Sequence, residues 1–252
     1  MLHFDDIVFG PIKSRRLGSS LGVNLLPSKG KLCNFDCVYC ECGWNRDGSQ
    51  DRTLPAFEDV RSALIEKIAM LSDEGVAVDT ITFSGNGAPT IHPDFPEIVD
   101  LVLELRDRYY PDAKVSVLSN ATMLGREKVR EALKRIDNPI LKIDASDDHL
   151  IGLINKPVDS YRLEDVIGWM KEFDGDFILQ TMFLRSGDFD LSDPEQLRRW
   201  MEIVRYLRPR EIMVYTIDRE TPDKSLGKYT IDEMKSFVAP LEDEGFKIQI
   251  RG

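Results

Sequence analysis

The stretch Cys33-Asn34-Phe35-Asp36-Cys37-Val38-Tyr39-Cys40 holds three of the chain's four cysteines, and the fourth, Cys42, follows two residues later. Thiolates are soft ligands that bind iron–sulfur clusters and zinc. Three of them in one short loop can hold three corners of a cubane [4Fe–4S] cluster, which leaves the fourth iron without a protein ligand. An iron without a protein ligand can bind a small molecule, so the stretch indicates a cluster that takes a further ligand.

These cysteines have alternatives to a cluster, namely burial in the core, zinc binding and disulfides. Cysteines are often buried hydrophobic residues, and clustered ones can bind structural zinc or form disulfides. Zinc sites usually pair two separated cysteine or histidine hooks, and the sequence has no second hook. A disulfide framework is typical of short secreted chains. For Cys42 a buried, inert thiol is favoured over a reactive thiol or an alternative ligand.

Length and composition limit the possible classes of protein. The chain has 252 residues, of which 42% are hydrophobic, and this predicts one domain over residues 1–252. Its first residues do not form a signal peptide, and no run of eighteen apolar residues occurs, so we expect no membrane partner and a cytoplasmic protein. The net charge of −11 argues against broad, nonspecific nucleic-acid binding.

Hydrophobic periodicity predicts strands that alternate with helices. The predicted strands cover residues 21–26, 80–84, 114–118, 140–144, 177–184, 211–217 and 246–250. The predicted helices cover residues 57–71, 95–108, 126–136, 163–173, 194–207 and 231–244. Capping signals agree: Asp193 and Thr230 precede helices, and Gly75, Gly175 and Gly245 follow them. Such alternation favours a parallel α/β sheet, either doubly wound or curled into a barrel.

The pattern C-x3-C-x2-C, with the aromatic Tyr39 just before the last cysteine, resembles the radical S-adenosylmethionine (SAM) enzymes. The resemblance implies that Cys33, Cys37 and Cys40 hold a [4Fe–4S] cluster whose open iron binds SAM. It implies reductive cleavage of SAM to a 5′-deoxyadenosyl radical, which abstracts hydrogen from a substrate. It also implies a partial (βα)6 barrel with an additional C-terminal strand, which selects the barrel over the doubly wound sheet.

A glycine-rich turn follows the second predicted strand. It reads Phe83-Ser84-Gly85-Asn86-Gly87-Ala88-Pro89-Thr90, and glycines let backbone groups approach a ligand closely. Alone, the turn is read more readily as a tight strand-to-helix connection. It is similar to the family segment G-x-G-E-P-T that contacts the SAM amine, which implies SAM contacts from Ser84, Gly85, Asn86 and Gly87. Ala88 departs from the pattern, because the family branch usually has glutamate there.

Further polar residues close the next predicted strands. Asn120 follows the third, and Lys142 and Asp144 lie at the end of the fourth, so all three are expected at one rim. Lys142 and Asp144 form either a structural pair or a site for the SAM carboxylate and ribose, and the resemblance favours the site. The resemblance also implies that Tyr39 contacts adenine through its backbone while its ring packs on the loop.

Other segments resemble a compact branch of radical SAM proteins related to the wyosine-base synthases, which remodel a tRNA guanine. These segments are residues 10–18, 155–157, 180–182 and 215–222. The similarity implies that Gln180, Tyr215, Asp218 and Arg219 point toward the substrate end of the barrel. For Asp218 and Arg219, a mutual ion pair is at least as plausible.

The expected activity is therefore that of a radical SAM oxidoreductase or transferase acting on an unidentified small molecule or peptide. Since no flavin or NAD motif is evident, an external flavodoxin or ferredoxin is expected to supply the electron. Wyosine-like tRNA modification is an alternative, but such enzymes hold a second cluster, and Cys42 alone cannot supply three more ligands. A noncatalytic iron–sulfur or zinc redox sensor remains a further alternative, which Ala88 keeps open.

Overall fold

The computed structural model describes residues 3–14, 17–48 and 52–252. All of its named strands join one mixed sheet in the order β1-β2-β3-β4-β5-β6-β7-β8. The strands are β1 Val8–Ser14, β2 Gly18–Val23, β3 Thr80–Phe83, β4 Lys114–Ser119, β5 Asn138–Lys142, β6 Ile178–Met182, β7 Glu211–Tyr215 and β8 Ile248–Arg251. Strand β1 pairs antiparallel with β2, and every later neighbour is parallel.

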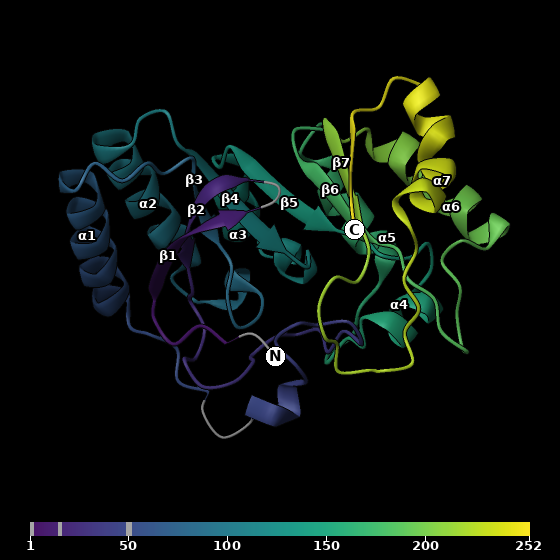
Figure 1. Cartoon of the computed structure of the whole chain (residues 1–252), viewed down its shortest axis with the longest axis horizontal. Coiled ribbons are helices and arrows are strands. Elements are labelled where there is room, and N and C mark those ends of the chain that lie inside the picture. The colour runs from purple at the N-terminus through teal and green to yellow at the C-terminus, as the bar shows by residue number, and fades with distance from the viewer. Residues whose placement is uncertain (1–2, 15–16, 49–51) are drawn as a thin grey trace.

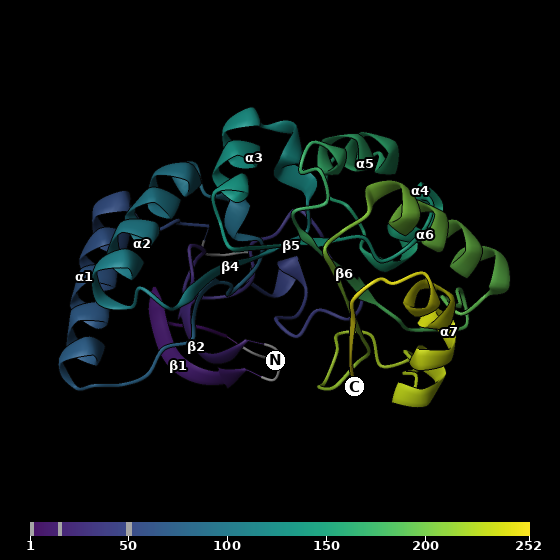
Figure 2. The same cartoon turned by 90° about the horizontal axis from the view of Figure 1, so that it is seen from above.

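Helices connect the parallel strands along the outside of the curled sheet (Figures 1 and 2). They are α1 Phe57–Asp73, α2 Phe95–Tyr109, α3 Glu127–Lys134, α4 Asp148–Ile154, α5 Leu163–Lys171, α6 Pro194–Leu207 and α7 Ile231–Asp243. Short 3-10 turns occur at Asn45–Gly48, Pro89–Ile91 and Thr122–Gly125. Six strand–helix repeats followed by β8 make up the predicted partial barrel with its additional C-terminal strand, so this prediction is confirmed.

Two elements were not predicted. Strand β1 contains Gly10-Pro11, a pair that argues against a strand interior, but an edge strand tolerates proline, and the β1–β2 register shifts between Phe9 and Ile12. Helix α4 has only seven residues, too few for a clear helical period.

The other elements differ from the prediction only in where they begin and end. The strand expected at residues 21–26 begins earlier, at Gly18, and that expected at 246–250 runs from Ile248 to Arg251. Arg15 and Arg16 lie outside the described residues.

Side chains alternate between the two faces of the strands, and this alternation separates core from site. Leu141, Leu179 and Ile212 are fully buried and belong to the large core cluster, whose partners include residues of the surrounding helices. The intervening positions form a small second cluster of Ile140, Ile178 and Met213. Further along the strands, the positions on that second face carry Lys142, Gln180 and Tyr215. At the rung nearer the amino ends, the same face carries Ser116, Asn138 and Glu211, so the apolar layer lies between polar residues at both ends of the strands.

No helix among the described residues is long and apolar enough to cross a membrane.

Candidate active site

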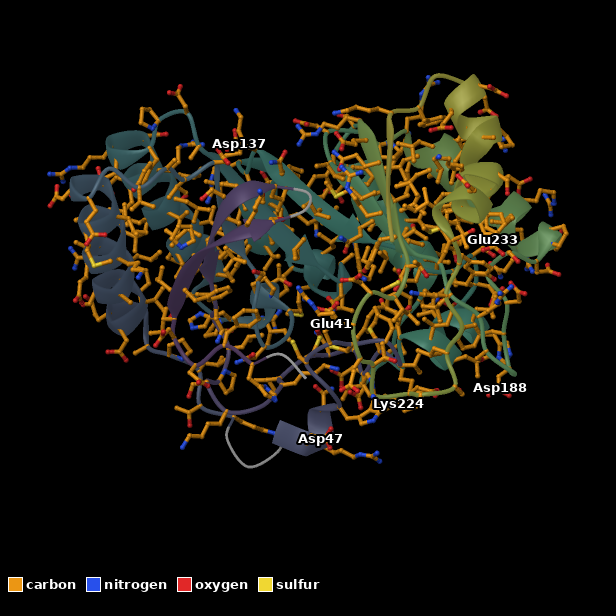
Figure 3. The ribbon with its side chains drawn as sticks, in the orientation of Figure 1. Glu41, Asp47, Asp137, Asp188, Lys224 and Glu233 are labelled. Carbon is orange, nitrogen blue, oxygen red and sulfur yellow. The ribbon has the colours of Figure 1, made fainter. Side chains whose placement is uncertain are left out.

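A cavity of about 260 Å³ lies at the carboxyl ends of the strands. Segments far apart in the sequence contribute to its wall: the cysteine loop, the glycine-rich turn and the ends of β4 to β7. Its lining residues are Lys31, Cys33, Phe35, Cys37, Tyr39, Cys40, Glu41, Cys42, Gly85, Gly87, Ala88, Leu118, Ser119, Asn120, Lys142, Gln180, Met182 and Tyr215. Figure 3 labels Glu41, which lines the cavity, and Asp137, which lies at the opposite ends of the strands, just before β5.

All four cysteines are unpaired thiols on the wall of this cavity. Within residues 3–14, 17–48 and 52–252, no group of three His, Cys, Asp or Glu side chains is gathered closely enough to hold one metal ion. A zinc ion needs its ligands within about 2.0–2.3 Å. A cluster of several iron atoms accepts thiolates that are spread over a wider space. Thiols of one loop on one cavity wall match the donor set that a multi-iron cluster requires.

The surroundings of the cysteines differ in their effect on the thiolates. Burial raises the pKa of the Cys33 thiol and raises the pKa of Cys37 to about 12. A hydrogen bond from Cys42 lowers the pKa of Cys40. Burial of Cys33 and Cys37 opposes their ionisation, so holding them as thiolates requires compensating positive charge.

Lys31 supplies positive charge beside the cysteines. Its ammonium group is buried, 3.0 Å from Asp36 Oδ1 and 3.2 Å from the Gly43 carbonyl oxygen. Burial alone would lower the pKa of Lys31, but the thiolates of Cys40, Cys33 and Cys37 raise it above its usual value. Sequence analysis gave this residue no role. Its position two residues before the first cysteine was the available signal.

The glycine-rich turn packs directly on the cysteine loop. The Leu32 N–H donates to the Asn86 carbonyl at 2.9 Å, and Leu32 and Gly87 form an isolated parallel bridge. Gly87 has φ +141°, and an added Cβ would lie 1.9 Å from the Leu32 carbonyl oxygen, so only glycine fits there. Gly85, Gly87 and Ala88 line the cavity.

The other two residues predicted in this turn have different surroundings. The fully buried Asn86 side chain hydrogen bonds to backbone groups of Phe4 and Pro27, and the Ser84 N–H donates to the Val23 carbonyl. Neither Ser84 nor Asn86 lines the cavity. A contact from them to a ligand stays a prediction.

Lys142 stands between two tyrosines in the cavity wall. Its Nζ donates to the hydroxyls of Tyr39, at 2.9 Å, and Tyr215, and it lies over both rings, 4.8 and 5.1 Å from their centroids. Burial alone would lower the pKa of Lys142, but Asp144 and Tyr215 raise it. The side chain is therefore a fixed cation at the cavity.

Asp144 lies behind this wall and is fully buried. Its Oδ1 accepts from the Met182 N–H at 2.9 Å, and its Oδ2 accepts from Tyr39 and, at 2.7 Å, from Asn155. Lys142 Nζ is 3.9 Å away. These contacts favour a structural role for Asp144 over direct contact with a ligand. The Tyr39 side chain is buried, and its hydroxyl joins this network.

The predicted substrate residues fall into two groups. Gln180 and Tyr215 line the cavity, but Asp218 lies in an adjoining cleft of about 60 Å³. Arg219 forms an ion pair with Glu41 at 2.6 Å, and this pair joins the β7–α7 loop to the cysteine loop. It takes the place of the ion pair between Asp218 and Arg219 that was the expected alternative. The cleft and the cavity share Glu41, Met182 and Tyr215. Sequence analysis assigned no role to Glu41.

Asn120 lies at the end of β4, as predicted, and also lines the cavity. Its Nδ2 is 3.5 Å from Cys33 Sγ and 3.2 Å from Asn34 Oδ1. The amide is thus directed at the cysteine loop.

Comparison with known proteins identifies the family. The sequence model of the radical SAM superfamily matches residues 28–190, which include the cysteine loop and the glycine-rich turn. The chain belongs to the radical SAM superfamily. Radical SAM enzymes use a [4Fe–4S] cluster and SAM, so the prediction of these cofactors is confirmed at the level of the family.

Individual relatives refine this placement within the radical SAM superfamily. A UPF0026 protein of Methanocaldococcus jannaschii is 30% identical over 238 residues, covering 92% of this chain and 70% of the relative. A radical SAM methyltransferase from Sphaerobacter thermophilus has a similar fold, with TM-score 0.67 and 13% identity over 92% of this chain and 65% of that chain. TYW1 with a lysine–pyruvate adduct bound has TM-score 0.61 and 14% identity, covering 89% of this chain and 73% of its own. That likeness shows the fold alone, so a closer relation to wyosine-base synthases is not shown.

Proposed function

We propose that the chain is a radical SAM enzyme that cleaves SAM reductively and abstracts hydrogen from a substrate. The observation that carries the proposal is the single cavity in which three cysteines of one loop face a glycine-rich turn and the polar ends of the strands. When bound, the cluster would pass one electron to the SAM sulfonium, and cleavage of SAM would supply a 5′-deoxyadenosyl radical. The chain's own residues bind, orient and enclose these groups, within one functional unit over residues 1–252.

Cys33, Cys37 and Cys40 are the proposed cluster ligands, and Lys31 balances part of their negative charge. Backbone groups of Gly85 and Gly87 are the proposed contacts of the SAM amine, because both glycines line the cavity. Asn120 and Lys142 offer an amide and a cation to the methionyl carboxylate and the ribose. Asp144 supports this site indirectly, since it fixes the hydroxyl of Tyr39.

The substrate is proposed to enter the part of the cavity lined by Gln180 and Tyr215. Asp218 and Arg219 stay candidates for the outer part of the entrance, where they lie beside the smaller cleft. A small molecule or peptide, an external flavodoxin or ferredoxin as electron donor, and a cytoplasmic location stay predictions.

Two other functions remain distinguishable by experiment. Wyosine-like tRNA modification is disfavoured by the net charge of −11 and by the lack of ligands for a second cluster. A tRNA mobility shift that weakens steeply with salt would support it instead. A noncatalytic redox sensor would hold iron and sulfide without SAM cleavage, and a structural site would hold zinc.

The experiment that tests the proposal is anaerobic reconstitution with iron and sulfide, followed by dithionite and SAM. Formation of 5′-deoxyadenosine is the expected result. A full cluster that yields none, with or without candidate substrates, would contradict the proposed activity and favour the sensor.

A further inference from the structure

The C-terminal end of α4 pairs with the cysteine loop on both sides of Cys37. The Asp36 N–H donates to the Asn155 carbonyl at 2.8 Å, and the Val38 N–H donates to the Ile154 carbonyl at 2.9 Å. These bonds fix the backbone around Cys37. They also bring the Asn155 side chain, which is fully buried, against the Cys37 thiol.

The Asn155 amide nitrogen faces three acceptors. It lies 3.4 Å from Cys37 Sγ, 3.1 Å from the Tyr39 hydroxyl oxygen and 2.7 Å from Asp144 Oδ2. An amide nitrogen carries two hydrogens, so it can serve the carboxylate and still direct a hydrogen at the sulfur. Through this one group, a proposed cluster ligand is connected to the network that holds Lys142.

The orientation of this amide follows from its neighbours. If the amide were flipped, its oxygen would face the Asp144 carboxylate and the sulfur, neither of which donates when ionised. The orientation is kept even though Asn155 Oδ1 is buried without a hydrogen-bond partner in the described part of the chain.

We infer that Asn155 is a positioning residue that donates a hydrogen bond to the Cys37 sulfur of the bound cluster and thereby raises the cluster's reduction potential. Reduction adds negative charge, part of which lies on the ligand sulfurs, and a directed N–H stabilises that charge. The inference rests on the proposed function, because it requires the three-cysteine cluster. It adds a residue outside the cysteine motif that controls how readily the cluster accepts its electron.

The test compares the reduction potential of the reconstituted cluster in the wild type, Asn155→Leu and Thr181→Val by titration monitored with EPR. Leucine keeps most of the volume of Asn155 and removes the donor. Thr181 is equally buried and also hydrogen bonded, to the Ile143 carbonyl and Trp200, but no contact to a cysteine is described for it, so Thr181→Val controls for general loss of buried polar contacts. We expect a lower potential in Asn155→Leu alone.

An intact cluster with the wild-type potential in Asn155→Leu would overturn this inference and leave the proposed function standing. A wild type that holds no iron–sulfur cluster would overturn both. If Asn155→Leu does not fold, Asn120→Ala labelled with ¹⁵N at asparagine side chains provides the test, since it removes the second side-chain amide that the described residues place beside a ligand sulfur. A coupling between the reduced cluster and a labelled nitrogen is then expected by ENDOR, and its absence would overturn the inference.

Discussion

Cys42 differs from the other three cysteines in its contacts. Its Sγ lies 3.5 Å from the Gly85 carbonyl oxygen, and its hydrogen bond with Cys40, together with burial, raises the pKa of the Cys42 thiol. We predict that Cys42→Ala keeps the reconstituted cluster, whereas Cys37→Ala loses it. Iron and sulfide content with the visible absorption spectrum measures this. Loss of the cluster in Cys42→Ala alone would show that the ligands are assigned wrongly.

Asp137 is a structural carboxylate far from the cavity. Burial by itself would raise its pKa, but hydrogen bonds from the Val115 N–H at 2.9 Å, Arg106 at 2.8 Å and Lys114 at 3.2 Å hold the pKa below its usual value. A lowered pKa stabilises the fold above the unfolded pKa of about 3.9, and the contribution is lost as the pH falls through the folded pKa.

Asp137→Asn should therefore lower the free energy of unfolding by about 1–2 kcal/mol near neutral pH. Urea unfolding of both proteins measures this difference, which should shrink below about pH 4. A difference that is the same at neutral and acid pH would show that the carboxylate charge does not stabilise the fold.

At the scale of elements, the cap of α7 was predicted from the pattern Thr230-Ile-Asp-Glu233 and is present in full. Thr230 Oγ1 accepts from the Glu233 N–H at 3.2 Å, and Glu233 Oε2 accepts from the Thr230 N–H at 2.7 Å. Thr230→Ala should destabilise the protein by about 1 kcal/mol, which thermal unfolding measures. Thr230→Ser keeps the hydroxyl and should retain most of the stability. Equal loss in both variants would mean that the threonine methyl group, and not the cap, is responsible.

Elements with a long hydrophobic period were predictable because burial of one face determines both period and type. Helix α6, for example, begins at Pro194 behind its N-cap Asp193, which accepts from two backbone N–H groups. Strand β1 and helix α4 lack such a period. Strand β1 forms by pairing with the adjacent strand β2 despite its irregular register, and the end of α4 is held by the cysteine loop, which is distant in sequence.

At the scale of the whole molecule, the residues that line the cavity could be predicted where they lie at the end of a strand. Lys142, Gln180 and Tyr215 line the cavity because they share the inner face of adjacent strands. Residues delivered by returning loops could not be placed. The contact of Arg219 with Glu41 and the approach of Asn155 to Cys37 depend on how long loops fold back, which the sequence does not encode in a short pattern.

The Glu41–Arg219 pair joins the cysteine loop to the loop between β7 and α7. About half of the Arg219 side chain is exposed, and such pairs typically contribute only about 0–1 kcal/mol. We predict that Arg219→Ala changes the unfolding free energy by less than about 1 kcal/mol and leaves the cluster intact. Chemical unfolding and iron content measure this, and loss of the cluster would mean that the pair holds the cysteine loop in place.

Quantification of 5′-deoxyadenosine is the most direct test of reductive SAM cleavage at the three-cysteine cluster. The anaerobically reconstituted wild type, Cys37→Ala and Cys42→Ala are each mixed with dithionite and SAM, and the product is measured by mass spectrometry. We expect product from the wild type and Cys42→Ala and none above background from Cys37→Ala. Equal product from Cys37→Ala, or none from a wild type that holds a full cluster, would contradict the proposed SAM cleavage.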